Sequence, residues 1–459
     1  MKKNNKKRNL AENQLFPPGN LIIKHKTMKK LITILFIITS LQLVGQEVAE
    51  LSLKEAVNKA LENNYGIITT KKSQEISEMN NTWGNTGALP TVKFVSSGSK
   101  SKNYNDEDDY TTQNLNGTVE MSKTLFRGFS AHIQKDRLEE LEKLSEGNVS
   151  LVVENTIYSV ILSYYNILLA QEQVDISKAN MELSKDRYQR EKERKEMGSS
   201  RTYDLLQAKN AFLQDSSDYL SAQSSYNNAV RELNYQMAEP MEKSYEFTSE
   251  FSPDTAAFEF EVLSEKMLEN NKTLRNQYIN LELAKLDVKS AKSAYYPTLS
   301  LKTSGGYASS ETDYENRDQM DRNSDGYNTS VSLSLSYTIF NGNARKRALK
   351  AAKIEQEISR IETKEMKQDL KNQLAQEFEL YNVRKQLLNV AEENLESAEL
   401  NLQLSKEKFN NGTISSFNFR DVQQLYQNAA YNYQRAVFNV IQSYHTLMRL
   451  TGGIIEEYD

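Results

Sequence analysis

Thr124-Leu125-Phe126-Arg127-Gly128 closely matches Thr338-Ile339-Phe340-Asn341-Gly342, which lies 214 positions farther along the chain. Gly198 and Gly412 are separated by the same 214 positions. One such match could arise by chance, but matches at a constant spacing indicate an internal duplication.

A second spacing relates the regions that precede these motifs. Leu61-Glu62-Asn63-Asn64 recurs as Leu268-Glu269-Asn270-Asn271, and Pro90 recurs as Pro297, each 207 positions away. The change from 207 to 214 indicates a seven-residue insertion after the proline of the second copy. We therefore predict a tandem-duplicated chain, and its parts are a leader (residues 1–45), a first repeat (residues 46–245) and a second repeat (residues 246–459).

The composition of the 459-residue chain favours long helices. Only 17 residues are Gly and 6 are Pro, so residues that interrupt helices are rare. The formal net charge of -5 is close to balance and gives no indication of a nucleic-acid partner. The chain has no cysteine, which excludes disulfides, thiolate catalysis, cysteine-bound metal and a lipid-modified N-terminal cysteine.

The leader has the pattern of a secretory signal peptide. Met28-Lys29-Lys30 is basic, the run from Leu31 to Val44 is largely apolar, and Gly45 precedes the polar sequence. The run is short for a transmembrane helix; an uncleaved anchor is the alternative, and Met28 is a candidate start. No other segment of the sequence reaches the roughly 18 apolar residues of a spanning helix, so contact with a membrane would use strands.

Each repeat is expected to contain the same three kinds of helix. These are an opening helix before the proline (52–87 and 260–295), a very long helix (130–197 and 343–410), and a shorter helix after the glycine (202–238 and 415–450). Apolar residues at heptad spacing predict that the long helices pack side by side. The heptad positions are Val174, Met181 and Tyr188 in the first long helix, and Leu388, Ala391, Leu395, Ala398, Leu402 and Phe409 in the second.

The strand pattern is clearest between residues 330 and 340, where apolar residues alternate with Ser and Thr. The apolar residues are Val331, Leu333, Leu335, Tyr337 and Ile339. Further strands are expected at residues 91–101, 114–125 and 298–307, with loops at the polar stretches 103–113 and 309–328. One apolar face and one hydroxyl face fit a soluble sheet or a membrane barrel, but four strands are too few to close a wide barrel alone.

The order of these motifs resembles the TolC-like outer membrane efflux protein family over nearly all of the mature chain. The motifs that carry the resemblance are the duplicated opening helix (51–64), the joints 295–301 and 337–342, and the tip 408–413. Each motif alone is weakly specific, whereas their order, spacing and duplication are specific. The resemblance implies a mostly α fold with a small β part, in which long coiled helices and four β-strands make up each protomer.

The family forms homotrimers, so the resemblance implies a twelve-stranded outer-membrane β-barrel continued by a periplasmic α-helical barrel. It also implies a passive exit duct of a tripartite efflux or type I secretion system, without a cofactor. The expected partners are a periplasmic adaptor protein and an inner-membrane transporter. The expected location is the bacterial outer membrane, with the helices in the periplasm, and the five apolar side chains of residues 330–340 then face lipid.

Under this resemblance the two glycines mark the periplasmic ends of helix hairpins. Gly198, Ser199, Gly412 and Thr413 are then expected to contact the adaptor, because a glycine permits the tight turn that ends a helix. The expected periplasmic aperture consists of an acidic constriction (Asn418, Asp421), interhelical latch positions (Tyr203, Asp204, Phe409, Ile414) and candidate cations (Arg201, Arg420). Neither Phe409 nor Ile414 has the polar or basic character of the family's latch, so one of these arginines is the expected cation. The alternative is that the acids are only solvated charges on a polar helix face.

An enzyme is disfavoured because the sequence has no catalytic motif. The three histidines, His25, His132 and His445, are scattered, and the acidic run 106–109 lacks the glycine and terminal glutamate of a calcium loop. We therefore expect no catalytic residue and no bound metal. The other alternative is a secreted coiled-coil scaffold or adhesin without a pore, which explains the helices and the leader but not the duplicated strands.

Overall fold

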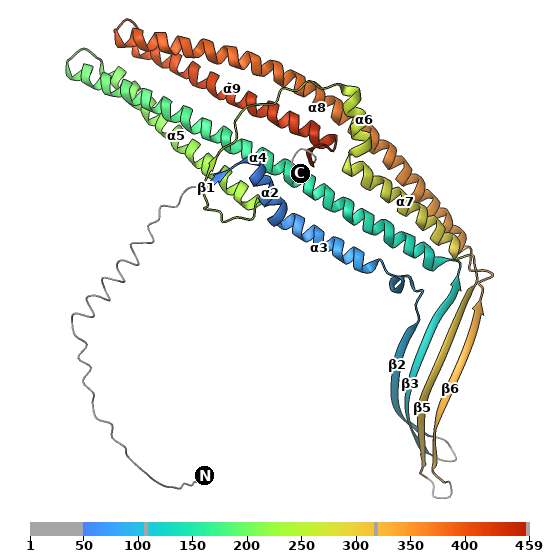
Figure 1. Cartoon of the computed structure of the whole chain (residues 1–459). Coiled ribbons are helices and arrows are strands. Elements are labelled where there is room, and N and C mark those ends of the chain that lie inside the picture. Colours follow the sequence, from blue (N-terminus) through green and yellow to red (C-terminus); the bar gives the residue numbers. More distant parts are fainter. Residues whose placement is uncertain (1–48, 105–108, 316–319, 456–459) are drawn as a thin grey trace, which may run out of the picture. The chain divides into compact units, whose positions relative to one another are not determined.

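The computed structural model describes residues 49–104, 109–315 and 320–455, and from Glu50 onward the chain forms one unit. The predicted leader and residues 105–108 of the acidic loop lie outside the described residues. Within the described residues the protein is mostly helical with a small strand part, which confirms the predicted fold class (Figure 1).

Two long helices, α4 (Ser130–Glu196) and α8 (Ala344–Asn410), have 67 residues each. A rise of 1.5 Å per residue makes each helix about 100 Å long. Each begins after two residues with positive φ, Gly128-Phe129 and Gly342-Asn343, which turn the chain from the sheet into the helix. Both long helices are therefore confirmed close to their predicted ends. None of the helices in the described residues is long and apolar enough to cross a membrane.

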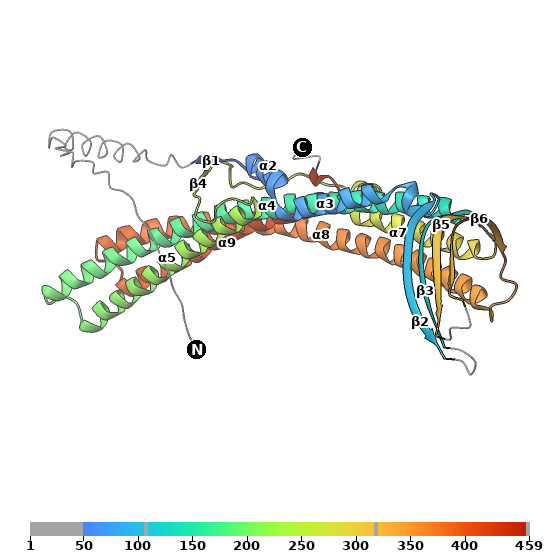
Figure 2. The same cartoon turned by 90° about the horizontal axis from the view of Figure 1, so that it is seen from below.

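Two shorter helices return alongside the long ones. α5 (Thr202–Gln236) packs against α4, and α9 (Ser416–Leu450) packs against both α8 and α4 (Figures 1 and 2). The lateral order toward the hairpin turns is therefore α5, α4, α9, α8. Toward the sheet α3 and α7 replace α5 and α9, and the order becomes α3, α4, α7, α8.

The predicted opening helices are wrong in one respect, because an asparagine interrupts each of them. The resulting segments are α2 (Leu53–Asn63) and α3 (Tyr65–Asn80) in the first repeat, and α6 (Phe260–Asn270) and α7 (Lys272–Ser293) in the second. Asn64 caps α3 through Oδ1 and donates Nδ2 to the carbonyl of Gln236 (2.9 Å), the last residue of α5. Asn271 caps α7 and donates to the carbonyl of Leu450 (3.0 Å), the last residue of α9. Asparagine favours such breaks because its side chain satisfies backbone donors at a helix start. A short 3-10 helix (Trp83–Thr86) follows α3.

A small two-stranded sheet pairs β1 (Ala49–Leu51) with β4 (Tyr245–Phe247). Sequence alternation does not predict it, because each strand has only three residues. The predicted boundary between the repeats, at residues 245 and 246, falls inside β4 and stays a prediction.

The larger sheet is antiparallel, with strands in the order β2 (Thr91–Asn103), β3 (Tyr110–Arg127), β5 (Thr298–Tyr314) and β6 (Arg322–Ser336). The strands extend farther into the polar stretches than predicted, so the predicted loops 103–113 and 309–328 are too long. Pairs such as Gln113 with Glu311 continue the ladder there, because backbone hydrogen bonds do not require apolar side chains.

At its other end β6 stops earlier than predicted, so Tyr337 and Ile339 lie beyond the strand. Ser336 pairs with Thr298, and Thr298 follows Pro297, which has no N–H for a further ladder hydrogen bond. Arg345 of α8 donates instead to the carbonyls of residues 338 and 339.

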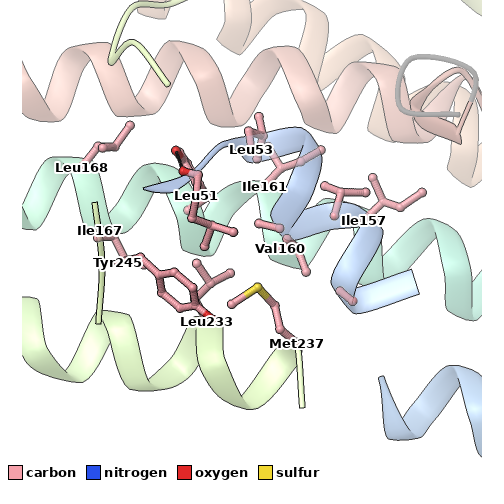
Figure 3. Close-up of a cluster of buried hydrophobic side chains, with 14 of the residues drawn as sticks. Leu51, Leu53, Ile157, Val160, Ile161, Ile167, Leu168, Leu233, Met237 and Tyr245 are labelled. Carbon is pink, nitrogen blue, oxygen red and sulfur yellow. Dashed lines mark hydrogen bonds between the residues drawn. The ribbon is translucent and has the colours of Figure 1, made fainter. Parts of the chain in front are cut away.

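Two apolar clusters hold the helices together around α2 and α6. The first apolar cluster joins β1, α2, α4 and α5 through buried side chains that include Leu51, Ile161 and Leu233 (Figure 3). The second apolar cluster joins α6, α8 and α9 through buried side chains that include Leu374 and Val440. Full burial of one such side chain is worth about 1.5–3 kcal/mol, so these clusters are the main apolar contribution to helix packing.

Candidate functional site

Two matching turns close the helix hairpins. Gly198 joins α4 to α5 with a φ of 74°, and Gly412 joins α8 to α9 with a φ of 71°. In each turn the next residue donates its N–H to the carbonyl five positions back, from Ser199 (2.8 Å) and from Thr413 (2.9 Å). These bonds satisfy carbonyls at the helix end, and the positive φ favours glycine over any other residue. All four residues predicted to contact an adaptor are exposed in these turns.

Just behind the turns, a cavity of about 440 Å³ lies between the first turns of α5 and α9. Four of the predicted aperture residues line it, which are Tyr203 and Asp204 from α5, and Arg420 and Asp421 from α9. Asp421 is exposed and Asp204 is half-buried. The structure thus brings two carboxylates from different hairpins to one groove.

The other four predicted aperture residues lie outside this groove. Arg201 is the exposed N-cap residue of α5, Ile414 is half-buried in its turn, and Asn418 is exposed on α9. Phe409 stacks on Phe419 with ring centroids 4.8 Å apart and an interplanar angle of 3°. Phe409 is therefore an aromatic contact within the α8–α9 hairpin.

A buried ion pair that no sequence pattern predicts lies beneath the groove. Arg420 donates two hydrogen bonds to the carboxylate of Asp215 in α5, at 2.5 and 2.7 Å. Ser184 of α4 donates to the same carboxylate, and Asp215 is only 1% exposed. A bidentate arginine–carboxylate pair is strong and directional, so it ties α5, α4 and α9 together at one point.

The ion pair adjoins a row of buried polar residues along α4, here called the polar seam. Its members are Ser177, Asn180, Ser184, Arg187 and Glu191, spaced alternately by three and four residues. That spacing is the one that apolar residues have in an ordinary coiled coil. Gln423 of α9 donates to Asn180 Oδ1 (2.6 Å), and Asn180 Nδ2 donates to Gln427 Oε1 (2.9 Å). The predicted apolar heptad positions of α4 are only half-buried beside the seam.

Charge is balanced within this part of the structure. Burial lowers the pKa of Arg187 to about 10, an effect that Arg420 strengthens and that Asp215 and Glu191 oppose. Glu191 accepts hydrogen bonds from Arg194 (2.9 Å) and from the hydroxyl of Ser200 (2.6 Å). A pKa of about 10 keeps the Arg187 guanidinium charged at neutral pH, so the seam contains fixed charges of both signs.

The register of the large sheet separates two faces. Leu333 pairs with Leu301 and Leu335 with Leu299, and the same face continues across β3 and β2 through Val119 and Phe94. The opposite face carries polar pairs, which are Ser332 with Lys302, Ser330 with Ser304, and Lys93 with Glu120. Val331, Leu333 and Leu335 are 65–78% exposed, so the apolar face is uncovered in the protomer. Tyr337 and Ile339 are also exposed, beyond the strand end.

The outermost helices of the protomer, α3 and α5 on one side and α8 on the other, carry uncovered apolar residues. On one side are Ile68, Ile76 and Met79 of α3, and Leu206, Leu213 and Leu220 of α5. On the other side are Ile354, Ile358, Ile361, Val383, Leu387 and Val390 of α8. The sheet likewise ends in two unpaired edges, β2 and β6. Uncovered apolar rows at helical spacing are typical of surfaces that pack against another chain.

Comparison with known proteins identifies one protein family over most of the chain. The family model described as outer membrane efflux protein matches residues 56–237 and 263–453. No curated protein matches the chain.

Several solved outer-membrane proteins share the fold. The Campylobacter jejuni CmeC outer membrane channel is 17% identical with a TM-score of 0.73, covering 97% of this chain and 94% of that one. The outer membrane protein VceC from Vibrio cholerae is 13% identical with a TM-score of 0.69, covering 87% of this chain and 96% of that one. The outer-membrane channel OprN is 16% identical with a TM-score of 0.72, covering 87% of this chain and 90% of that one.

Identities this low establish a common fold only, whereas the family match spans most of the chain. The CmeC and OprN structures are described as outer-membrane channels. The chain therefore belongs to the outer membrane efflux protein family, which places it in the outer membrane.

Proposed function

We propose that the protein is the homotrimeric exit duct of a tripartite efflux or type I secretion system. The supporting observation is that α3, α5 and β2 form one uncovered side of the protomer, while α8 and β6 form the other. When one side of each copy meets the opposite side of the next, the contact repeats around an axis and closes a ring. Closure pairs β6 with the β2 of a neighbouring copy and leaves no strand edge unpaired.

Three copies bring twelve strands together, enough for a barrel with an open lumen. In this assembly the face of Val331, Leu333 and Leu335 contacts lipid and the serine face lines the lumen. Tyr337 and Ile339 continue the apolar surface at the membrane boundary. Projection images of detergent-purified particles should show tubes with threefold symmetry, and compact single protomers would contradict the proposal.

The orientation of the sheet is testable because the native chain has no cysteine. Ser332→Cys and Leu333→Cys are adjacent on β6 but lie on opposite faces. In membranes a water-soluble maleimide should label Ser332→Cys and leave Leu333→Cys largely unlabelled. Equal labelling of both variants would exclude the lumen and lipid assignment.

The hairpin turns are the proposed contact surface for a periplasmic adaptor, which joins the duct to an inner-membrane transporter. Support comes from the exposure of Gly198, Ser199, Gly412 and Thr413 at the ends of both hairpins. Gly412→Val forces a β-branched residue into a positive φ and should reduce efflux while trimers still form. Asn411→Val, at a φ of -83°, is the matched control and should retain efflux. Full efflux by Gly412→Val would refute the turn assignment.

The groove between α5 and α9 is the proposed periplasmic aperture. Because Arg420 is bonded to Asp215, it is not available to neutralise Asp421. Threefold symmetry then repeats Asp204 and Asp421 around the axis, and such a ring of carboxylates attracts cations. In planar bilayers Asp421→Asn should lose cation selectivity, whereas Asp186→Asn, an exposed acid of α4, should not. Unchanged selectivity and unchanged block by a trivalent cation in Asp421→Asn would leave Asp421 as a surface acid.

A further inference from the structure

The two repeats end α5 and α9 with the same backbone geometry. Ala238 after α5 and Gly452 after α9 have positive φ values of 54° and 74° and lie 214 positions apart. In both turns the next residue donates its N–H to the carbonyl five positions back, over 2.9 Å. Asn64 and Asn271 bond to the ends of these helices in the same way. The surroundings of the two turns can therefore be compared position by position.

In the first repeat, the segment after the turn folds back over α2 and α5. Glu239 forms an ion pair with Lys59 of α2 (3.0 Å), and Asn234 of α5 donates to the carbonyl of Lys243 (2.8 Å). Tyr245 is 6% exposed within the first apolar cluster, and β4 pairs with β1. Residues 239–247 thus cover this surface with one segment, which turns between Pro240 and Lys243 and then continues as β4.

In the second repeat, the corresponding surface is an open groove of about 650 Å³. Phe258 and Lys266 line this groove and lie 207 positions after Leu51 and Lys59. Met448 also lines it and lies 214 positions after Asn234, which it replaces. Within the described residues no strand pairs with residues 256–258, which lie 207 positions after β1. Among these same residues the backbone of Phe258 has no hydrogen-bond partner and Lys266 has no carboxylate partner.

The chain after α9 does not repeat the course of residues 239–247. Gly453 lines the groove, but Ile454 is fully buried in the first apolar cluster, and Ile455 packs against that cluster. Since the described chain leads away from the groove at this point, the duplication leaves the surface uncovered in the second repeat. A segment of another polypeptide can cover the groove as residues 239–247 cover the first repeat.

We propose that this groove binds a segment of a partner protein, which turns once, as residues 240–243 do, and then adds as a strand beside Ala257 and Phe258. Strand addition satisfies the free backbone groups, as in other complexes where a peptide extends a sheet edge. Lys266 selects a carboxylate on the segment, as Lys59 does with Glu239. An aromatic side chain six residues farther along packs on Val262 and Met448, in the manner of Tyr245 in the first repeat.

The probe is a fluorescent peptide with the sequence of residues 239–249, titrated against the full-length protein in detergent. Fluorescence anisotropy should show saturable binding. Val262→Asp adds a charge to the exposed wall of the groove and should weaken binding about tenfold. Lys266→Glu should weaken it about fivefold. Lys289→Glu changes another exposed lysine, on α7 outside the groove, and should have no effect.

A peptide in which the residue equivalent to Tyr245 is serine should also bind less tightly, and circular dichroism should confirm that all protein variants keep their helices. Absence of binding, or binding that Val262→Asp and Lys266→Glu leave unchanged, overturns the proposal. Binding that appears only after deletion of residues 456–459 overturns the partner assignment, because it identifies the protein's own C-terminal segment as the occupant.

Discussion

The apolar clusters and the polar seam hold the same helices in different ways. Near α2, helix α4 buries Ile157, Ile161 and Tyr164, but toward its turn it buries Arg187 and Glu191. Apolar contacts depend little on direction, whereas hydrogen bonds require a fixed geometry. A small rotation of a helix therefore preserves packing in the clusters but breaks bonds in the seam. We expect any rearrangement of the hairpins to start at the turn end, where these bonds can be exchanged for others.

The largest effect is expected from removing one member of the buried ion pair. Asp215→Leu leaves the guanidinium of Arg420 without its carboxylate and should lower the free energy of unfolding by about 4 kcal/mol. The double variant Asp215→Leu/Arg420→Met removes both charges and should recover most of the loss. Denaturant titration of the detergent-solubilised protein measures both values. A double variant as unstable as the single one would show that the seam is held by packing rather than by the pair.

A smaller loss is expected in the second apolar cluster. Leu374 is completely buried there, and Leu374→Ala should lower the free energy of unfolding by about 3 kcal/mol. Lys371→Ala, an exposed position on the same helix, should cost less than about 0.5 kcal/mol. The loss in Leu374→Ala should persist in 1 M salt, because salt screens charges and does not weaken apolar burial. A loss that disappears in salt would remove the distinction between cluster and seam.

One buried acid lies at the level of the clusters and should respond to pH. Glu154 of α4 is 4% exposed, and burial raises its pKa to about 7, although Lys272 and Arg449 oppose this. The folded protein holds this proton more tightly than the unfolded chain, so stability falls as the pH rises from 4.5 to 7. Glu154→Gln should therefore stabilise the protein by about 2 kcal/mol at pH 8 and leave it unchanged at pH 4. Thermal unfolding at both pH values tests this, and an equal gain at pH 4 would contradict a raised pKa.

The long helices could be predicted for two reasons. α4 and α8 contain no proline, and in both repeats a glycine lies just before and just after the long helix at the same spacing. The turns at Gly198 and Gly412 could be predicted for the same reason. The breaks at Asn64 and Asn271 could not, because asparagine is tolerated within a helix until another helix end comes close enough to accept its amide.

The polar seam has the heptad spacing of a buried surface, but its residues are ones that usually face water. The sequence does not reveal whether such a row is solvated or paired with another helix. Asp215 and Arg420 are 205 positions apart, so only the fold shows that they meet. The early end of β6 could not be predicted either. Pro297 limits the strand at Ser336 only because Thr298, the residue after the proline, pairs with Ser336.

Asn64 joins the end of α5 to the start of α3 by a hydrogen bond, so these two helices are aligned although no peptide bond connects them. α5 runs toward Asn64 and α3 continues away from it in the same direction, as α9 and α7 do around Asn271 (Figure 1). Helix continuity is thus independent of the order in which the gene encodes the helices. Because Leu51 and Ile454 lie in one cluster, the ends of the described chain are close enough to be joined by a short linker. A circular permutant opened between β4 and α6 would encode the second repeat first and keep these helix-to-helix bonds.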